Sequence, residues 1–124
     1  MIKNNIKITV KVTPIEAQTL PFKSQYAFAY TITISNQGQI GSRLISRHWL
    51  IQDETGYTEE VIGEGVVGEQ PHLLPNEAFE YTSGAMIKTP TGTMKGKYHM
   101  ISDTGENFSV EIAEFVLSKP YTLQ

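Results

Sequence analysis

The glycines of residues 63–71, GEGVVGEQP, have the spacing G-x-G-x-x-G. In enzymes that bind dinucleotides, this spacing lets backbone amides hold a pyrophosphate at the start of a helix. No helical pattern follows here, because the segment runs directly into a proline. Glu64 and Glu69 also bring two negative charges to the expected phosphate position. The segment is therefore more typical of a glycine-rich strand end than of a dinucleotide site.

A looser site, in which backbone N–H groups of this segment bind an anion, is the alternative. Its residues would be Gly63, Gly65, Val66, Val67 and Gly68. Arg43 and Arg47 are the candidates to supply positive charge, although the sequence does not place either side chain beside the segment.

Asp103-Thr104-Gly105 has the sequence of the triplet that pairs across a dimer in some aspartic proteases. Here it lies between two strand-like runs, where Asp, Thr and Gly are typical of a hairpin turn. Asp53–Gly56 has the same turn chemistry. We therefore expect a turn rather than a protease dyad.

Other catalytic and metal-binding patterns are missing from the sequence. His48, His72 and His99 stand in none of the spacings that bind zinc, and there is no G-x-S-x-G or S-x-x-K. Surface carboxylates bind magnesium weakly with one or two ligands, so magnesium or cobalt binding stays open without support from ligand spacing. We expect no catalytic residues, no enzyme activity and no cofactor.

Composition narrows the remaining classes of protein. A chain of 124 residues is predicted to form a single domain over residues 1–124. The net charge of −3 gives no basic surface for nucleic acid or anionic lipid. There is no cysteine, which excludes disulfides and thiol nucleophiles, and no apolar run long enough to span a membrane. We expect a cytoplasmic protein.

The elements that must position these residues follow a period of two. The clearest strand is YAFAYTITIS at residues 26–35; RLISRHWLIQD at residues 43–53 is predicted to be a central strand, with Leu44 on the face of Leu50, opposite Trp49. In residues 108–117 the apolar set changes phase, which predicts a bulge near Ala113 and Glu114. About seven or eight short strands indicate an all-β, antiparallel β-sandwich of the immunoglobulin or fibronectin type III kind, with a closed barrel as the alternative.

Five ordered motifs resemble the bacterial ApaG family over nearly the whole chain. They are SRHWLIQD, GEGVVGEQP, FEYTSG, G-x-M-x-G-x-Y at residues 92–98 and F-x-V-E-I-x-x-F-x-L at residues 108–117. The resemblance implies a fibronectin type III-like sandwich and an association with cobalt and magnesium resistance or efflux. It also implies a gene neighbourhood shared with a diadenosine tetraphosphate hydrolase. Related domains occur in an F-box subunit of ubiquitin ligases and in a DNA polymerase delta-interacting protein, which implies a recognition module.

We therefore expect a non-catalytic binding module whose partner is a protein, as a monomer or a homodimer. The candidate partner-binding residues are Arg47, His48, Glu64, Glu69, Gln70 and Pro71. The alternative is a small-molecule sensor that binds a phosphate-bearing nucleotide or pyrophosphate, with or without magnesium, through residues 63–68.

Overall fold

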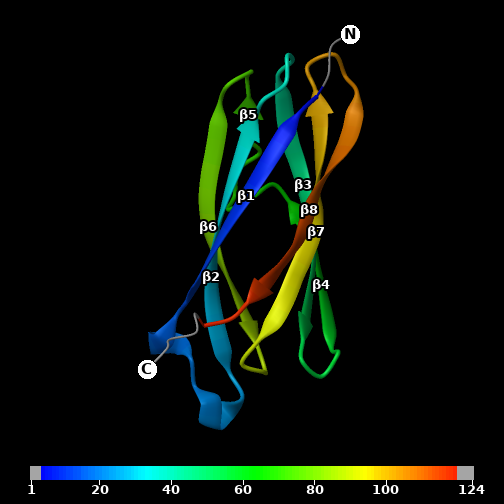
Figure 1. Cartoon of the computed structure of the whole chain (residues 1–124). Helices are drawn as coiled ribbons and strands as arrows, with labels where there is room; N and C mark the ends of the chain where they lie inside the picture. The colour runs from blue at the N-terminus through cyan, green and yellow to red at the C-terminus, as the bar shows by residue number, and fades with distance from the viewer. Residues whose placement is uncertain (1–3, 120–124) are drawn as a thin grey trace.

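Two antiparallel sheets pack face to face in the computed structural model, which describes residues 4–119 (Figure 1). The first sheet has the order β1 (Ile6–Pro14), β2 (Tyr26–Asn36) and β6 (Ala78–Ile87). The second has the order β4 (Thr58–Glu64), β3 (Ser42–Asp53), β7 (Gly92–Ser102) and β8 (Asn107–Leu117), and β5 (His72–Leu73) pairs with β3 beyond the end of β4. The predicted all-β, antiparallel sandwich of about seven or eight strands is confirmed, with eight strands among residues 4–119.

The only helical segments among residues 4–119 are the 3₁₀ turns η1 (Glu16–Gln18) and η2 (Pro21–Lys23), both between β1 and β2. Neither has the length or the apolar sequence needed to cross a membrane.

Strand β2 forms because its apolar and polar residues alternate strictly. Phe28, Tyr30, Ile32 and Ile34 are buried between the sheets, while the intervening alanine and threonines lie on the outer face, as the sequence predicts. Burying each large apolar side chain stabilises the fold by roughly 1.5–3 kcal/mol. This strand therefore supplies much of the first sheet's contribution to the core.

Strand β3 is the central strand that its sequence predicts, but the prediction that Leu44 lies on the face opposite Trp49 is wrong. Its pairing with β7 shifts register between Leu44 and Ser46, so Ile45 is the extra residue of a bulge. The bulge reverses the alternation, and fully buried Leu44 therefore shares the inner face with Trp49 rather than the outer face with Leu50. A strict alternation, which ignores the bulge, places Leu44 on the wrong face.

The second bulge was predicted correctly. Met94 pairs with Phe115 and Gly96 pairs with Ile112, so Lys95 faces both Ala113 and Glu114 on β8. The extra residue brings both halves of β8 into phase with the core.

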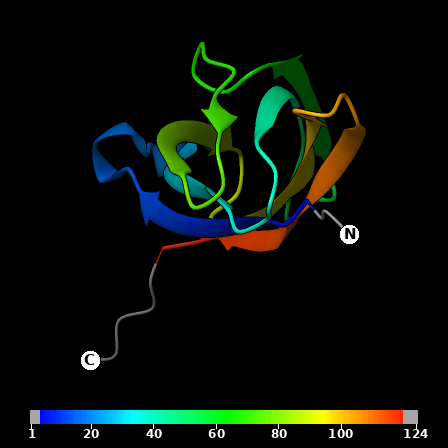
Figure 2. The same cartoon turned by 90° about the horizontal axis from the view of Figure 1, so that it is seen from above.

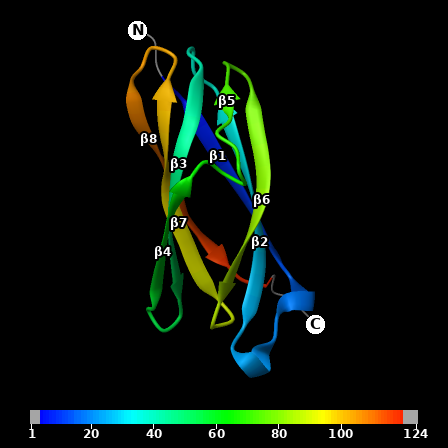
Figure 3. The same ribbon diagram turned by 180° about the vertical axis from the view of Figure 1, so that it is seen from behind.

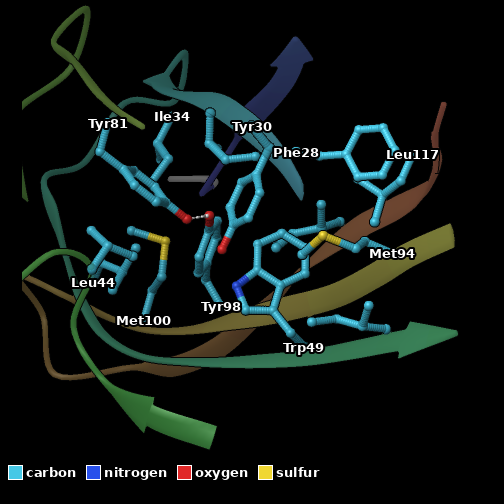
Figure 4. Close-up of a cluster of buried hydrophobic side chains, with 14 of the residues drawn as sticks. Phe28, Tyr30, Ile34, Leu44, Trp49, Tyr81, Met94, Tyr98, Met100 and Leu117 are labelled. Atoms are coloured by element: carbon cyan, nitrogen blue, oxygen red, sulfur yellow. Dashed lines mark hydrogen bonds between the residues drawn. The ribbon is translucent and has the colours of Figure 1, made fainter. Parts of the chain in front are cut away.

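Aromatic rings from both sheets meet at the centre of the core (Figure 4). The ring of Trp49 lies edge-on to Tyr30, Tyr98 and Phe115, with centroid distances of 5.5, 6.2 and 5.9 Å. The hydroxyls of Tyr81 on β6 and Tyr98 on β7 form a buried hydrogen bond of 2.5 Å that joins the two sheets. Burial raises the pKa of Tyr81 to about 12, and burial likewise raises the pKa of Tyr98.

The two long sides of the sandwich differ. On one side β1 lies against β8, as the view from above shows (Figure 2). The other side is bounded by β6 and β4, which end their sheets, and we call it the open side. The connection from β4 to β5 protrudes there (Figure 2). The segment 63–71, singled out from the sequence, therefore lies at an accessible place.

Candidate functional site

The segment 63–71 starts with the last two residues of β4 and then crosses the open side before it reaches β5 (Figure 3). The Gly65 N–H donates to the Ile45 carbonyl at 2.8 Å. Val66 and Glu69 exchange two backbone hydrogen bonds, of 2.8 and 2.9 Å, and so close a tight turn around Val67 and Gly68. The segment therefore contains a defined turn at its centre.

The turn holds a valine in an unusual conformation. Val67 has φ +43° and Gly68 has φ +81°, the pattern of mirror-image hairpin turns, in which glycine or asparagine is preferred. A β-branched residue at positive φ is strained by roughly 1–3 kcal/mol, and such strain persists only where the surroundings impose it. Buried Val66 anchors the turn, while the side chain of Val67 is 55% exposed. The turn thus presents an apolar side chain to solvent.

Arg47 holds the start of this segment. Its Nη1 donates to the carbonyls of Glu64 and Gly65, at 3.0 Å each. A Cβ at position 63 would lie 2.7 Å from Nη2 of Arg47, so Gly63 makes room for the guanidinium group. Gly65 has φ +61°, and a Cβ there would lie 2.2 Å from the carbonyl oxygen of Glu69. Gly65 is therefore required by the protein's own backbone packing, whereas a side chain at position 63 would have to displace the Arg47 guanidinium.

These hydrogen bonds use several of the groups that the anion-binding alternative would need. The amides of Gly65 and Val66 donate to carbonyl oxygens of the protein, and the Arg47 guanidinium is directed at two further carbonyls. Within residues 4–119 the N–H groups of Val67 and Gly68 have no such partner, and no helix follows them. Gly63 pairs with Arg47 in the ladder between β3 and β4. Among residues 4–119, the N–H groups of Val67 and Gly68 are therefore the two of the predicted set Gly63, Gly65, Val66, Val67 and Gly68 that stay available, and anion binding stays a prediction.

The end of the segment is fastened to β3 as well. The side chain of Gln70 donates to the Ile45 carbonyl at 3.0 Å, and the Gln70 carbonyl accepts from Arg43 Nη1 at 2.8 Å. The Pro71 carbonyl accepts from the Leu44 N–H at 3.0 Å. The Ile45 carbonyl accepts hydrogen bonds from both the Gly65 N–H and the Gln70 side-chain amide. The sequence did not point to Ile45, because a backbone carbonyl carries no signal of residue type.

The predicted partner-binding residues fall into two places. Arg47, Glu64, Glu69, Gln70 and Pro71 meet at the segment, as described above. His48 instead lies on the outer face of β3, where its Nε2 is 2.8 Å from Glu60 Oε2. There it borders a shallow hollow of about 360 Å³, lined also by Leu50, Lys95, Gly96, Lys97, Glu111, Ile112, Ala113 and Glu114. Arg47 and His48 therefore do not form one site.

The triplet at residues 103–105 is a hairpin turn, as predicted. The Gly105 N–H donates to the Ser102 carbonyl, and Gly105 has φ +88°. The Asp103 carboxylate lies 2.8 Å from Nε2 of His72, a pairing between distant connections that no sequence spacing reveals. In the described part of the chain, no three histidine, cysteine, aspartate or glutamate side chains gather as a metal site would require.

Replacing Arg47 by methionine is expected to loosen the segment without unfolding the domain. Two hydrogen bonds to a charged donor are lost, which costs roughly 2 kcal/mol, while methionine retains much of the aliphatic packing. Amide hydrogen exchange at Gly65, Val66 and Glu69 should become at least about tenfold faster, in line with local opening. Arg43→Met, which loses only the hydrogen bond to the Gln70 carbonyl, is the matched control and should leave hydrogen exchange at the Gly65 amide unchanged. Unchanged exchange in Arg47→Met would refute this role.

Known proteins resemble this chain over nearly its whole length. The ApaG domain family matches residues 16–102. Protein ApaG of Nitrosomonas eutropha is 54% identical over 121 residues, covering 98% of this chain and 95% of that protein. Protein ApaG of Xanthomonas campestris is 52% identical over 119 residues, covering 94% of each chain. A crystal structure of an ApaA protein from Bordetella pertussis superposes with a TM-score of 0.93 at 46% identity, covering 96% of this chain and 97% of that one. The chain therefore belongs to the ApaG family.

Proposed function

We propose that this protein is a non-catalytic, cytoplasmic binding module that recognises another protein through the segment 63–71. The observation that supports it most is the turn at Val67, where an apolar side chain is exposed on a strained backbone. Strain of this kind concentrates at functional sites. A turn held in one conformation also loses little conformational entropy on binding, which favours affinity.

The surroundings of Val67 suit a protein interface. Glu64 and Glu69 are exposed on either side of it, so an apolar centre is bordered by charge, as in many interfaces. The recognition role implied by related domains agrees with this arrangement. The cobalt and magnesium association that the family implies would then act through the partner rather than through a metal held by this chain.

The second candidate is a sensor of a phosphate-bearing nucleotide or pyrophosphate. The N–H groups of Val67 and Gly68, which have no partner among residues 4–119, are the observation that favours it. Titration of ¹⁵N-labelled protein with pyrophosphate, ATP and diadenosine tetraphosphate, with and without magnesium, tests it. Saturable shifts confined to these two amides would support the sensor, and unchanged spectra would exclude these ligands.

The protein-binding proposal is tested by affinity capture from lysate with quantitative mass spectrometry, comparing two substitutions. Val67→Asp places a charge at the turn, whereas Val116→Asp places the same charge on β8, where the valine is equally accessible at 57% exposure. We expect a partner recovered by the parent protein and by Val116→Asp, but reduced at least about tenfold by Val67→Asp. Equal recovery by all three proteins, or no specific recovery by any, contradicts the proposal.

A further inference from the structure

The hydrogen-bonding pattern of β6 shows which of its backbone groups face away from β2. The Asn36 N–H donates to the Glu77 carbonyl at 2.9 Å, so these two residues form a hydrogen-bonded pair. Hydrogen-bonded and non-hydrogen-bonded pairs alternate along antiparallel strands. The register of β2 and β6 is continuous, so the N–H and C=O groups of Glu80, Thr82, Gly84 and Met86 point away from β2. Among residues 4–119, β6 pairs with no other strand.

The other sheet edges carry features that discourage pairing with a further strand, and β6 does not. Strand β1 has Lys7, Lys11 and Pro14; β8 has the bulge described above; and β4 has three glutamates within seven residues. Strand β6 is ten residues long, with one charged residue, Glu80, and with no proline and no bulge in its pairing. It is therefore the unprotected edge of the sandwich.

A hollow of about 210 Å³ lies beside the second half of β6, on the open side. It is lined by Ile51, Asp53, Tyr57, Glu59, Met86, Ile87 and Lys88. Tyr57 and Met86 are exposed by 64% and 50%, so each offers apolar surface. A strand added along Thr82–Met86 would continue the first sheet and direct alternate side chains between the sheets, toward this hollow.

The charge around this hollow is mainly negative. It contains the carboxylates of Asp53 and Glu59 and one cation, Lys88, whose Nζ lies 5.9 Å from the ring centre of Tyr57. The hydrogen bond from the Thr55 hydroxyl lowers the pKa of Asp53, aided by backbone N–H donors, so this carboxyl stays ionised. A basic side chain with an aliphatic stem suits such a place, because the stem packs on apolar surface while the charge meets a carboxylate.

We propose that the second half of β6 binds an extended segment of a partner protein by strand addition, with lysine or arginine at alternate positions facing the hollow. β-Branched residues occupy the intervening positions, next to Thr82 on the outer face. Main-chain hydrogen bonds to Thr82, Gly84 and Met86 supply affinity, and the basic side chains supply specificity. The inference rests on the proposed function, because it names the chemistry of the partner and a second contact on the open side.

The test uses the heptapeptide acetyl-VKVKVKV-amide as the probe and ¹⁵N-labelled protein. We expect saturable shifts of the amides of Thr82, Gly84 and Met86, together with slower hydrogen exchange at the same amides. Acetyl-VEVEVEV-amide should bind at least about tenfold more weakly, because its charges meet Asp53 and Glu59 with the same sign.

Substitutions at outward-facing positions separate strand addition from other contacts. Thr82→Pro removes an edge N–H but no main-chain hydrogen bond to β2, so it should abolish binding of the peptide. Thr82→Val should retain binding, and it controls for the hydroxyl bond to Thr31, which both substitutions remove. Gly84→Pro repeats the test if Thr82→Pro does not fold. Ile62→Pro makes the same change on β4 and should leave binding intact.

Three results would overturn the proposal: no saturable binding, loss of binding in Ile62→Pro but not in Thr82→Pro, or a peptide-independent dimer formed through β6. The last would make a second copy the occupant of this edge. Capture of a lysate partner that depends on Val67 but not on Thr82 would leave the proposed function standing and refute strand addition alone. If Val67→Asp instead recovered the partner as well as the parent protein and Val116→Asp do, the proposed function itself would be refuted.

Discussion

Gly96→Ala is expected to destabilise the fold by about 3 kcal/mol, at the upper end of the range for overpacking a core. A Cβ at this position would lie 2.1 Å from the His48 carbonyl oxygen and 3.1 Å from Cε3 of Trp49. The backbone of β3 has little freedom to move away, because it is paired with β4 on its other side. Trp49 is held in place by three aromatic rings. The added methyl group must therefore force β3 and β7 apart.

Gly84→Ala is the matched control for this effect. Gly84 also lies within a strand and has no positive φ, but a Cβ there would meet its nearest atom, the Phe28 carbonyl oxygen, at 3.5 Å. Urea unfolding should place the Gly84→Ala free energy within about 0.5 kcal/mol of the parent value. Thermal unfolding should show Tm of Gly96→Ala lowered by on the order of 10 °C. Equal stability of the two variants would contradict the close packing at Gly96.

The sandwich was predictable because its main strands alternate so regularly. In β2 every second residue is apolar, and the buried face follows directly. The phase change in residues 108–117 disclosed the bulge of β8, since Phe108, Val110 and Ile112 cannot share a face with Phe115 in a regular strand. In β3 apolar residues lie on both faces, so the sequence there did not reveal the bulge at Ile45.

The candidate site was predictable in its location but not in its internal contacts. Glycine spacing and Pro71 marked the segment 63–71, but the sequence did not place the Arg47 side chain beside it, where the structure has it. Nothing in the sequence showed that Gly63 makes room for Arg47, because this depends on the register of β3 and β4. His48 was grouped with Arg47 because they adjoin in sequence, yet adjacent strand residues project to opposite faces.

The protein is expected to lose stability steeply above pH 10, through its buried tyrosine pair. An unfolded tyrosine has a pKa of about 10, whereas burial raises the pKa of Tyr81 to about 12 and that of Tyr98 in the same direction. Between pH 10 and 12 the unfolded chain therefore releases protons that the folded protein retains. Each tyrosine then lowers the free energy of unfolding by up to about 1.4 kcal/mol per pH unit, and the stabilisation present below pH 10 is lost progressively.

The double variant Tyr81→Phe with Tyr98→Phe should remove most of this pH dependence, because neither position then titrates. Replacing both partners of a buried hydrogen bond with apolar groups of similar shape is close to neutral, whereas replacing one leaves a buried hydroxyl unpaired at a cost of about 1–3 kcal/mol. At pH 8 the double variant should thus be more stable than either single variant. Urea unfolding from pH 8 to 12, followed by tryptophan fluorescence, measures both effects. Tyr57→Phe, at an exposed tyrosine, is the control and should keep the parent slope. A double variant that loses stability as steeply as the parent would show that the alkaline transition arises elsewhere.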